Sequence, residues 1–152
     1  MQETDERGTP LEIFRPLHDL FDFTLDPCAM RGRPLYELPE WRFKEYFIED
    51  NGLSKNWTGE KCFVNPPYSR GSISDWVKKM SEEAAKGTFI CALVRQDCST
   101  EWYRTIKRIS WHIEEIPYRV SFAGAKQSSK PFWSSVIMLM GGPFPLRKQC
   151  KS

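Results

Sequence analysis

Glu60-Lys-Cys-Phe-Val-Asn-Pro-Pro-Tyr68 is the most informative segment of the chain for its fold. Its apolar first half predicts a buried strand over residues 60–65, and the prolines that follow cannot continue the strand because they lack a backbone N–H donor. Open α/β sheets bind their ligands at the carboxyl ends of their strands. We therefore expect Asn65, Pro66, Pro67 and Tyr68 to form a loop at the ligand-binding edge of such a sheet.

Upstream of this stretch the sequence predicts an amphipathic helix. Thr9 suits its cap, Pro10 suits the first helical position, and Glu12 completes a capping box. Pro16 removes one amide donor, so a kink or a 3₁₀ stretch is expected there. The apolar residues that follow at helical spacing are Ile13, Phe14, Leu17, Leu20 and Phe21.

The segment between this helix and the strand predicted over 60–65 has a weaker pattern. Alternating residues over 22–26 predict a short strand that places Asp26 at its carboxyl end. Residues 30–56 have poor periodicity, and for them we expect a loop, a short helix near Trp41 and a short strand over 46–48.

Downstream, helical and strand-like patterns alternate. Ser74 suits the cap of a helix that Gly87 ends, with a Glu82–Lys86 pair on its surface. Its apolar face comprises Trp76, Val77, Met80 and Ala84. The remaining predicted elements are a helix capped by Asp97 or Ser99, carrying Trp102, Tyr103, Ile106 and Ile109 on one side, and strands over 88–94, 111–113, 118–122 and 135–140.

This order of elements predicts an α/β fold with a mostly parallel sheet and an antiparallel edge. The 152 residues, of which 40% are hydrophobic, suit a single domain over 1–152, and the tail over 141–152 is expected to be loosely held. Four tryptophans are expected to be buried in the core: Trp57, Trp76, Trp102 and Trp111.

Composition also narrows the classes of function. No apolar run is long enough to span a membrane and no signal peptide is evident, so we expect a soluble, cytoplasmic protein. Five cysteines without a CxxC pair indicate reduced thiols, and two distant histidines give no metal site. The net charge of +2 does not by itself indicate a nucleic-acid partner, although local basic groups could meet phosphates.

The Asn-Pro-Pro-Tyr loop has residue types that suit methylation of an aromatic amine. Such an amine is a poor nucleophile, so two groups must accept hydrogen bonds from its N–H groups as positive charge develops on the nitrogen. The Asn65 side-chain oxygen and the Pro66 carbonyl oxygen can be these two acceptors. Tyr68 offers a flat face on which a flipped base can stack. No general base needs to act before transfer, because the amine can lose its proton afterwards. The alternative is that the tetrapeptide is a turn that ends a strand.

In order along the chain, several blocks resemble the phage-type Dam-like DNA N6-adenine methyltransferases. Thr9-Pro10 looks like the family's N-terminal motif, and Phe23 to Ala29 looks like its cofactor motif. The catalytic strand and loop are similar to Phe63 to Ser69. Further similar blocks are Asp50-Asn51-Gly52-Leu53 with Trp57, Thr100 with Trp102, Arg119 with Phe122, and Pro131-Phe132 with Ser134-Ser135.

The resemblance implies an S-adenosylmethionine-dependent enzyme that methylates the N6 amine of an adenine flipped out of double-stranded DNA. It implies an abbreviated Rossmann-like sheet, because too little chain separates Asp26 from Asn65 for several βαβ units. The implied catalytic residues are Asn65, Pro66, Pro67 and Tyr68, and the implied cofactor-binding residues are Thr9, Pro10, Asp26, Pro27, Cys28, Ala29, Asp50 and Asn65.

Two segments depart from the family pattern. Arg31-Gly32-Arg33 stands where the family has an asparagine-containing segment, and Asp97-Cys98-Ser99 stands where it has Arg-Thr-Asp. No separate recognition domain fits in the chain, so DNA contacts are expected from rim segments and sequence specificity is expected to be relaxed. The rim segments are 31–33, 69–72 and 124–130, with Arg31, Arg33, Ser69, Arg70, Lys126 and Lys130 as the DNA-binding candidates.

Three alternatives remain open from the sequence. The same loop would serve a methyltransferase that acts on RNA adenine or on a protein glutamine. A nonenzymatic nucleic-acid-binding protein would keep the loop as a turn and use its basic groups to bind phosphate. The target sequence, the oligomeric state and the biological role are not determined by the sequence.

Overall fold

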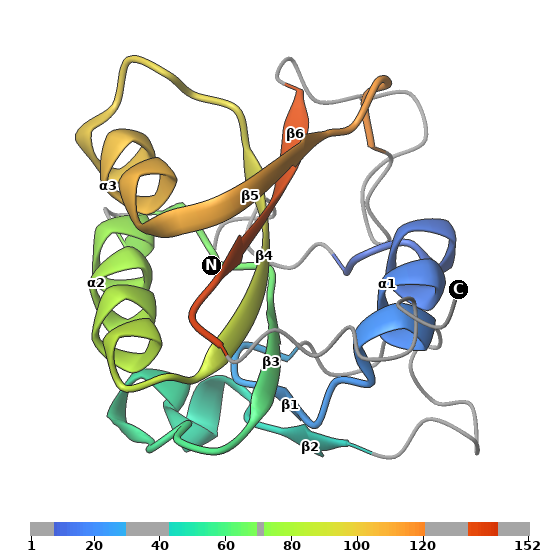
Figure 1. The fold of residues 1–152 in the computed structure, drawn as a ribbon. Helices are drawn as coiled ribbons and strands as arrows, with labels where there is room; N and C mark the ends of the chain where they lie inside the picture. The colour runs from blue at the N-terminus through green and yellow to red at the C-terminus, as the bar shows by residue number, and fades with distance from the viewer. Residues whose placement is uncertain (1–7, 30–42, 70–71, 121–133, 143–152) are drawn as a thin grey trace.

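A six-stranded sheet with helices on both faces forms the framework of the protein (Figure 1). The computed structural model describes residues 8–29, 43–69, 72–120 and 134–142. Its elements are α1 (Leu11–Phe21), β1 (Leu25–Asp26), β2 (Lys44–Glu45), the 3₁₀ turns η2 (Ile48–Asp50) and η3 (Gly52–Ser54), β3 (Lys61–Val64), α2 (Ser72–Ala85), β4 (Phe89–Arg95), α3 (Glu101–Ile109), β5 (Ser110–Glu115) and β6 (Ser135–Met140).

The strands follow the order β2-β1-β3-β4-β6-β5 across the sheet. The first four are parallel, whereas β6 runs antiparallel to both of its neighbours, β4 and β5. This is the predicted mostly parallel sheet with antiparallel strands at one edge. The chain leaves β1 toward β2 and then returns to β3 on the other side of β1, so the order of strands reverses between β1 and β3. Such a reversal is the place where open α/β sheets bind ligands.

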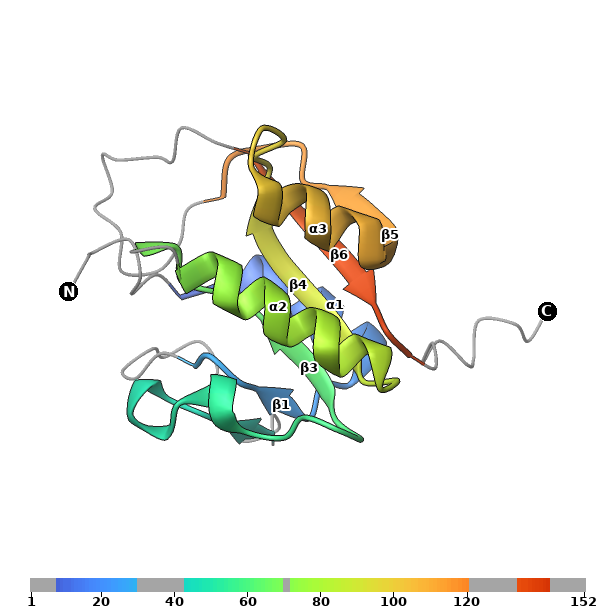
Figure 2. The same ribbon diagram turned by 90° about the vertical axis from the view of Figure 1, so that its left-hand side faces the viewer.

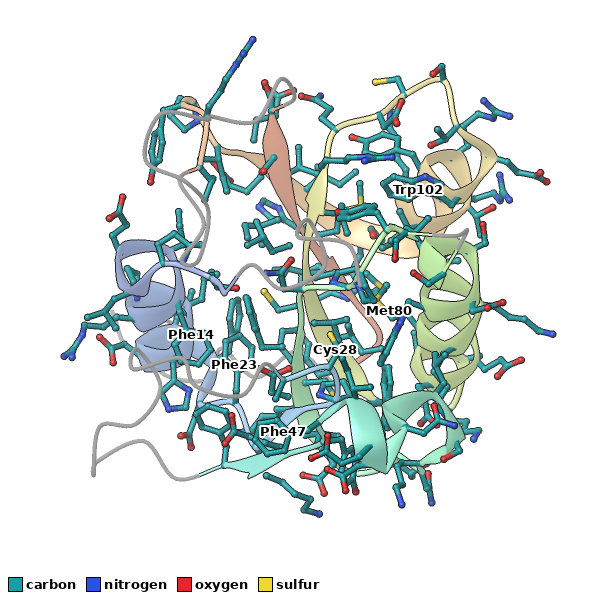
Figure 3. All side chains as sticks on the ribbon, turned by 180° about the vertical axis from the view of Figure 1, so that it is seen from behind. Phe14, Phe23, Cys28, Phe47, Met80 and Trp102 are labelled. Atoms are coloured by element: carbon teal, nitrogen blue, oxygen red, sulfur yellow. The ribbon has the colours of Figure 1, made fainter. Side chains whose placement is uncertain are left out.

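Successive side chains along the strands point to opposite faces of the sheet, so they contribute to two apolar layers, one on each face. On β3, Cys62 and Val64 face the layer under α2 and α3, while Phe63 faces the layer under α1. Both faces are covered, which explains why β4 and β6 are almost continuously apolar. Figure 2 shows α2 lying across one face of the sheet, and Figure 3 shows Phe14 and Phe23 on the α1 side with Met80 on the α2 side.

The N-terminal elements differ from their sequence prediction. α1 begins at Leu11 with Pro10 as its cap and no side-chain cap bond, so Thr9 does not cap the helix. Pro16 lies inside an uninterrupted α-helix, without the expected 3₁₀ stretch. Asp22 adopts a left-handed conformation (φ 58°) that ends α1, and this leaves only Leu25–Asp26 for the predicted strand.

In the next segment, the short strand predicted over 46–48 occurs instead at Lys44–Glu45, where it pairs with β1. The helix predicted near Trp41 lies outside the described residues.

Downstream, β3, β4, α2, α3 and β6 confirm the predicted elements, and Gly87, with a positive φ of 94°, ends α2 as predicted, while both predicted N-caps are wrong. Ser74 lies within α2 rather than before it, and Thr100, not Asp97 or Ser99, caps α3 by accepting a bond from the Tyr103 amide at 3.3 Å. Residues 118–120 form no strand, and the rest of that predicted strand lies outside the described residues.

Two side-chain predictions in this half of the molecule also need correction. Lys86 pairs with Glu83 at 3.5 Å, not with the predicted Glu82. Trp57, Trp76 and Trp102 are buried as expected, but Trp111 is 45% exposed, because its strand β5 lies at the edge of the sheet.

Candidate active site

The carboxyl ends of β1 and β3 bring together the two blocks with the most informative sequence. Asp26 is the last residue of β1, and Asn65 follows the last residue of β3. β1 and β3 are adjacent and parallel, with Leu25 opposite Cys62. The Cys28 thiol donates to the Asn65 carbonyl oxygen at 3.2 Å and so links the two loops directly. Two blocks 37 residues apart in sequence therefore meet where the order of strands reverses.

Asn65 is held from a second side by the segment that precedes α1. Its Nδ2 donates to the Thr9 hydroxyl oxygen at 3.0 Å, and Thr9 is only 2% exposed. The hydroxyl that sequence reasoning assigned to a helix cap is therefore used in a tertiary contact. Pro66 is buried, and the Pro67 carbonyl accepts from the Ser72 hydroxyl at 3.1 Å, which ties the loop to the start of α2.

Asp26 presents a carboxylate that is 4% exposed. Its Oδ1 accepts from the Cys28 amide at 3.2 Å, so the carboxylate shapes the turn that follows β1. The next residue, Pro27, packs against Gly52, where a Cβ would lie only 1.9 Å from the Pro27 carbonyl oxygen. Glycine at position 52 thus allows the η2–η3 segment to lie against the turn after β1.

Asp50 has a structural partner of its own. Its Oδ2 accepts from the Phe47 amide at 2.9 Å and stabilises the η2 turn. Asn51 is left-handed (φ 53°), and the Trp57 indole nitrogen donates to the Gly52 carbonyl at 3.0 Å. The block Asp50 to Leu53 with Trp57 is therefore one folded unit, placed next to the β1 turn through Gly52.

Tyr68 lies partly buried between the loop after β3 and the carboxyl end of β4. Its hydroxyl oxygen accepts from the Arg95 amide at 2.9 Å, and the Arg95 guanidinium lies 4.4 Å from its ring centroid. The Trp102 ring lies 5.7 Å away. Burial raises the pKa of Tyr68 well above its usual range, so the phenol stays protonated.

Sequence reasoning missed two residues at this edge of the sheet. Arg95 ends β4 and forms an ion pair with Asp97 at 3.5 Å. It lies two residues before the segment Asp97-Cys98-Ser99, which stands where the family has Arg-Thr-Asp. Glu45 ends β2 and is the direct register partner of Asp26. An acid about 20 residues beyond the end of the first strand is the signal that could have found it, because open α/β sheets use such an acid to bind a ribose.

Most of the predicted DNA-binding residues lie outside the described residues: Arg31, Arg33, Arg70, Lys126 and Lys130. Ser69 follows the loop and is partly buried. In the described part of the chain, no helix is long and apolar enough to cross a bilayer. Over the same ranges, no three or more His, Cys, Asp or Glu side chains are grouped to hold a metal ion.

The sheet order and the Asn-Pro-Pro-Tyr loop at the reversal of strand order define the class of the protein, a Rossmann-like methyltransferase fold. The family model described as DNA N-6-adenine-methyltransferase (Dam) matches residues 1–144, and the chain belongs to this family. It is 28% identical over 119 residues to the DNA N-6-adenine-methyltransferase of Haemophilus phage HP1 (strain HP1c1). The match covers 76% of this chain and 62% of the length of that relative.

Proposed function

We propose that this protein transfers a methyl group from S-adenosylmethionine to the N6 amine of adenine in DNA. One observation carries the proposal: a loop of the required residue types, Asn65 to Tyr68, is fixed by hydrogen bonds at the reversal of strand order. Membership of the DNA N-6-adenine-methyltransferase family supports this choice of substrate.

In this mechanism the loop accepts hydrogen bonds from the adenine amine. The Asn65 side-chain oxygen and the Pro66 carbonyl oxygen are the two acceptors, and they become more favourable partners as positive charge develops on N6. The two prolines and the contacts of Asn65 with Thr9 and Cys28 restrict the loop, so little reorganisation is needed during transfer. The surplus proton leaves after transfer, so no basic side chain is required at N6.

The residues around β1 fit S-adenosylmethionine in their chemistry. When bound, this cofactor supplies a methyl group on a sulfonium, and it also carries a charged amine and a ribose. Asp26 offers a buried carboxylate and Glu45 a second acid in register with it, which suit a cation and ribose hydroxyls. Thr9, Pro10, Pro27, Cys28, Ala29 and Asp50 complete the proposed cofactor set.

Asp26→Ala should raise the dissociation constant for S-adenosylmethionine more than it lowers the rate at saturating cofactor. The reason is that the carboxylate is proposed to contact the cofactor mainly in the ground state. Calorimetry measures the binding and single-turnover assays measure the rate. If the variant and the wild type bind the cofactor equally well, Asp26 is not a cofactor ligand.

We propose that DNA presents the adenine flipped out of the duplex, with Tyr68 as its stacking platform. The basic candidates on the rim would hold phosphates, so binding should weaken steeply as salt rises. The recognised DNA sequence should be short, or its recognition relaxed, because rim loops can hold few side chains in place for bidentate hydrogen bonds to bases.

The decisive experiment incubates the protein with methyl-labelled S-adenosylmethionine and unmethylated DNA, with RNA and a glutamine-containing protein in parallel. Nucleoside analysis should find N6-methyladenine from DNA alone. Asn65→Ala should lower the transfer rate by at least ~100-fold while cofactor affinity is kept, because a transition-state acceptor is removed. Label in RNA or protein instead would assign a different substrate, and an Asn65→Ala variant with near-normal turnover would reject the mechanism.

A further inference from the structure

We propose that Thr9 is a positioning residue that holds the Asn65 amide in its productive orientation. The inference rests on the proposed function and adds a role to Thr9 that differs from binding the cofactor. It starts from one contact, in which Asn65 Nδ2 donates to Thr9 Oγ1 at 3.0 Å across 56 residues of sequence.

An asparagine side chain has two chemically different ends. One is an NH₂ group that only donates, and the other is a carbonyl oxygen that only accepts. The proposed reaction needs the accepting end, because the adenine amine brings only protons to the loop. An amide turned by half a rotation would set its own NH₂ against the adenine NH₂, and no hydrogen bond would form.

In the structure Thr9 accepts from the nitrogen end of the amide. The two ends lie on opposite arms of a planar group, so fixing Nδ2 also fixes the direction in which Oδ1 points. Thr9 is 2% exposed, so water competes little for this contact. The backbone of Asn65 is fixed separately, since its carbonyl oxygen accepts from the Cys28 thiol at 3.2 Å. Together these contacts leave the amide few other orientations.

The position of Thr9 in the chain supports a fixed hydroxyl. It directly precedes Pro10, the extended cap residue of α1, and α1 is anchored on the sheet by the buried Phe14. The hydroxyl does not cap that helix and accepts from the Asn65 side chain instead. A side chain held this way can orient Asn65 without touching the substrate.

Two variants separate the hydroxyl from the shape of the side chain. Thr9→Val keeps the branched shape and removes the acceptor, and Thr9→Ser keeps the acceptor. Thr9→Val should lower kcat at saturating cofactor by about tenfold, the effect of one lost hydrogen bond, with KM for DNA within roughly twofold of wild type. Thr9→Ser should stay within about threefold of the wild-type kcat.

A double variant tests whether the effect acts through Asn65. In an Asn65→Ala background there is no amide to orient, so Thr9→Val should lower the rate no further. An additive loss would overturn the proposal. A Thr9→Val variant with weaker cofactor binding and an unchanged rate at saturation would also overturn it, because Thr9 would then be a cofactor ligand only.

A spectroscopic measurement keeps the contact testable without turnover. In ¹⁵N-edited NMR spectra, the Asn65 side-chain NH₂ pair is assigned by its absence in Asn65→Ala. It should shift strongly in Thr9→Val and little in Thr9→Ser, and equal shifts in both would overturn the contact. If the wild type transfers no methyl group to DNA, the proposed function fails, while these spectra still report whether Thr9 orients the amide.

Discussion

At the scale of single residues, Tyr68 is held at its hydroxyl and on one side of its ring. The Arg95 amide donates to the hydroxyl at 2.9 Å, and the Arg95 guanidinium lies over the ring at 4.4 Å. A cation over the ring and a hydrogen bond at its tip restrict rotation of the side chain. The sequence predicted a stacking platform but did not predict a partner that fixes its plane.

Different substitutions at Tyr68 should therefore have different consequences. Tyr68→Ala should weaken capture of the flipped base by ~1–3 kcal/mol, the scale of one stacking contact. Tyr68→Phe should keep most of this capture but lower the free energy of unfolding by about 1 kcal/mol, because the Arg95 amide loses its acceptor. DNA-binding titrations and denaturant unfolding measure the two effects. If Phe weakens base capture as much as Ala does, the hydroxyl acts on the substrate and stacking is not the role.

At the scale of elements, the η2–η3 segment depends on close contact with its neighbours. Gly52 lies against the Pro27 backbone, and the Trp57 ring stacks on Trp76 of α2 with ring centroids 6.1 Å apart. On the same helix, burial raises the pKa of Glu83, but its ion pairs with Lys79 and Lys86 and the nearby Trp57 backbone outweigh this effect and lower the pKa overall. The contact between the two tryptophan rings joins α2 to the η2–η3 segment.

Gly52→Ala tests this close contact. Its Cβ would lie 1.9 Å from the Pro27 carbonyl oxygen, so the backbone must move and the free energy of unfolding should fall by about 3 kcal/mol. Gly59→Ala is the control, because a Cβ there meets nothing within 4 Å and the cost of about 1 kcal/mol comes from its positive φ alone. Denaturant unfolding compares them. Equal losses in the two variants would show that Gly52 needs no close approach.

The sequence predicted the long elements of this fold better than the short ones. β4 has a run of six apolar residues and β6 a run of five, which a local pattern can identify. β1 and β2 have two residues each, and they exist because β1 pairs with β2 on one side and with β3 on the other, which no local pattern shows.

The same reason applies to the candidate site. Asn65 and Asp26 could be named as candidates from the sequence because Asp26 ends a predicted strand and Asn65 ends the next. Arg95 was missed because its proximity to them depends on the order of strands, which local sequence does not reveal.

At the scale of the whole molecule, the α1 side of the core contains a buried histidine. The His18 Nδ1 accepts from the Phe23 amide at 3.1 Å, and its ring stacks on Phe14 with centroids 5.3 Å apart. Burial, with a smaller effect of Lys61, lowers the pKa of His18, although Asp22 and Asp19 oppose the shift. The folded state therefore favours the neutral ring, whose Nδ1 can accept.

Mild acid should destabilise the protein through this group. A histidine whose pKa is lower in the folded state stabilises fully above the unfolded value of 6.5, and its contribution is lost as pH falls from 6.5 through the folded pKa. Denaturant unfolding at about pH 7 and pH 5 should show a loss of stability that shrinks in His18→Gln. His112→Gln, at an exposed position on β5, is the control. A full loss in His18→Gln would assign the acid sensitivity to other groups.

The place of β6 in the sheet has a consequence for how the protein is made. β6 is the last strand in the described part of the chain, yet it lies between β4 and β5 and all six of its residues are buried. While a ribosome is still synthesising residues before Ser135, β4 has no partner on one side and β5 has none to join it to the sheet. An apolar strand edge of this kind is prone to pair with other chains. The β6–β5 part of the sheet thus forms only after residues 135–140 have left the ribosome. A nascent chain that stops before residue 135 exposes an unpaired edge of β4, which can pair with strands of other chains.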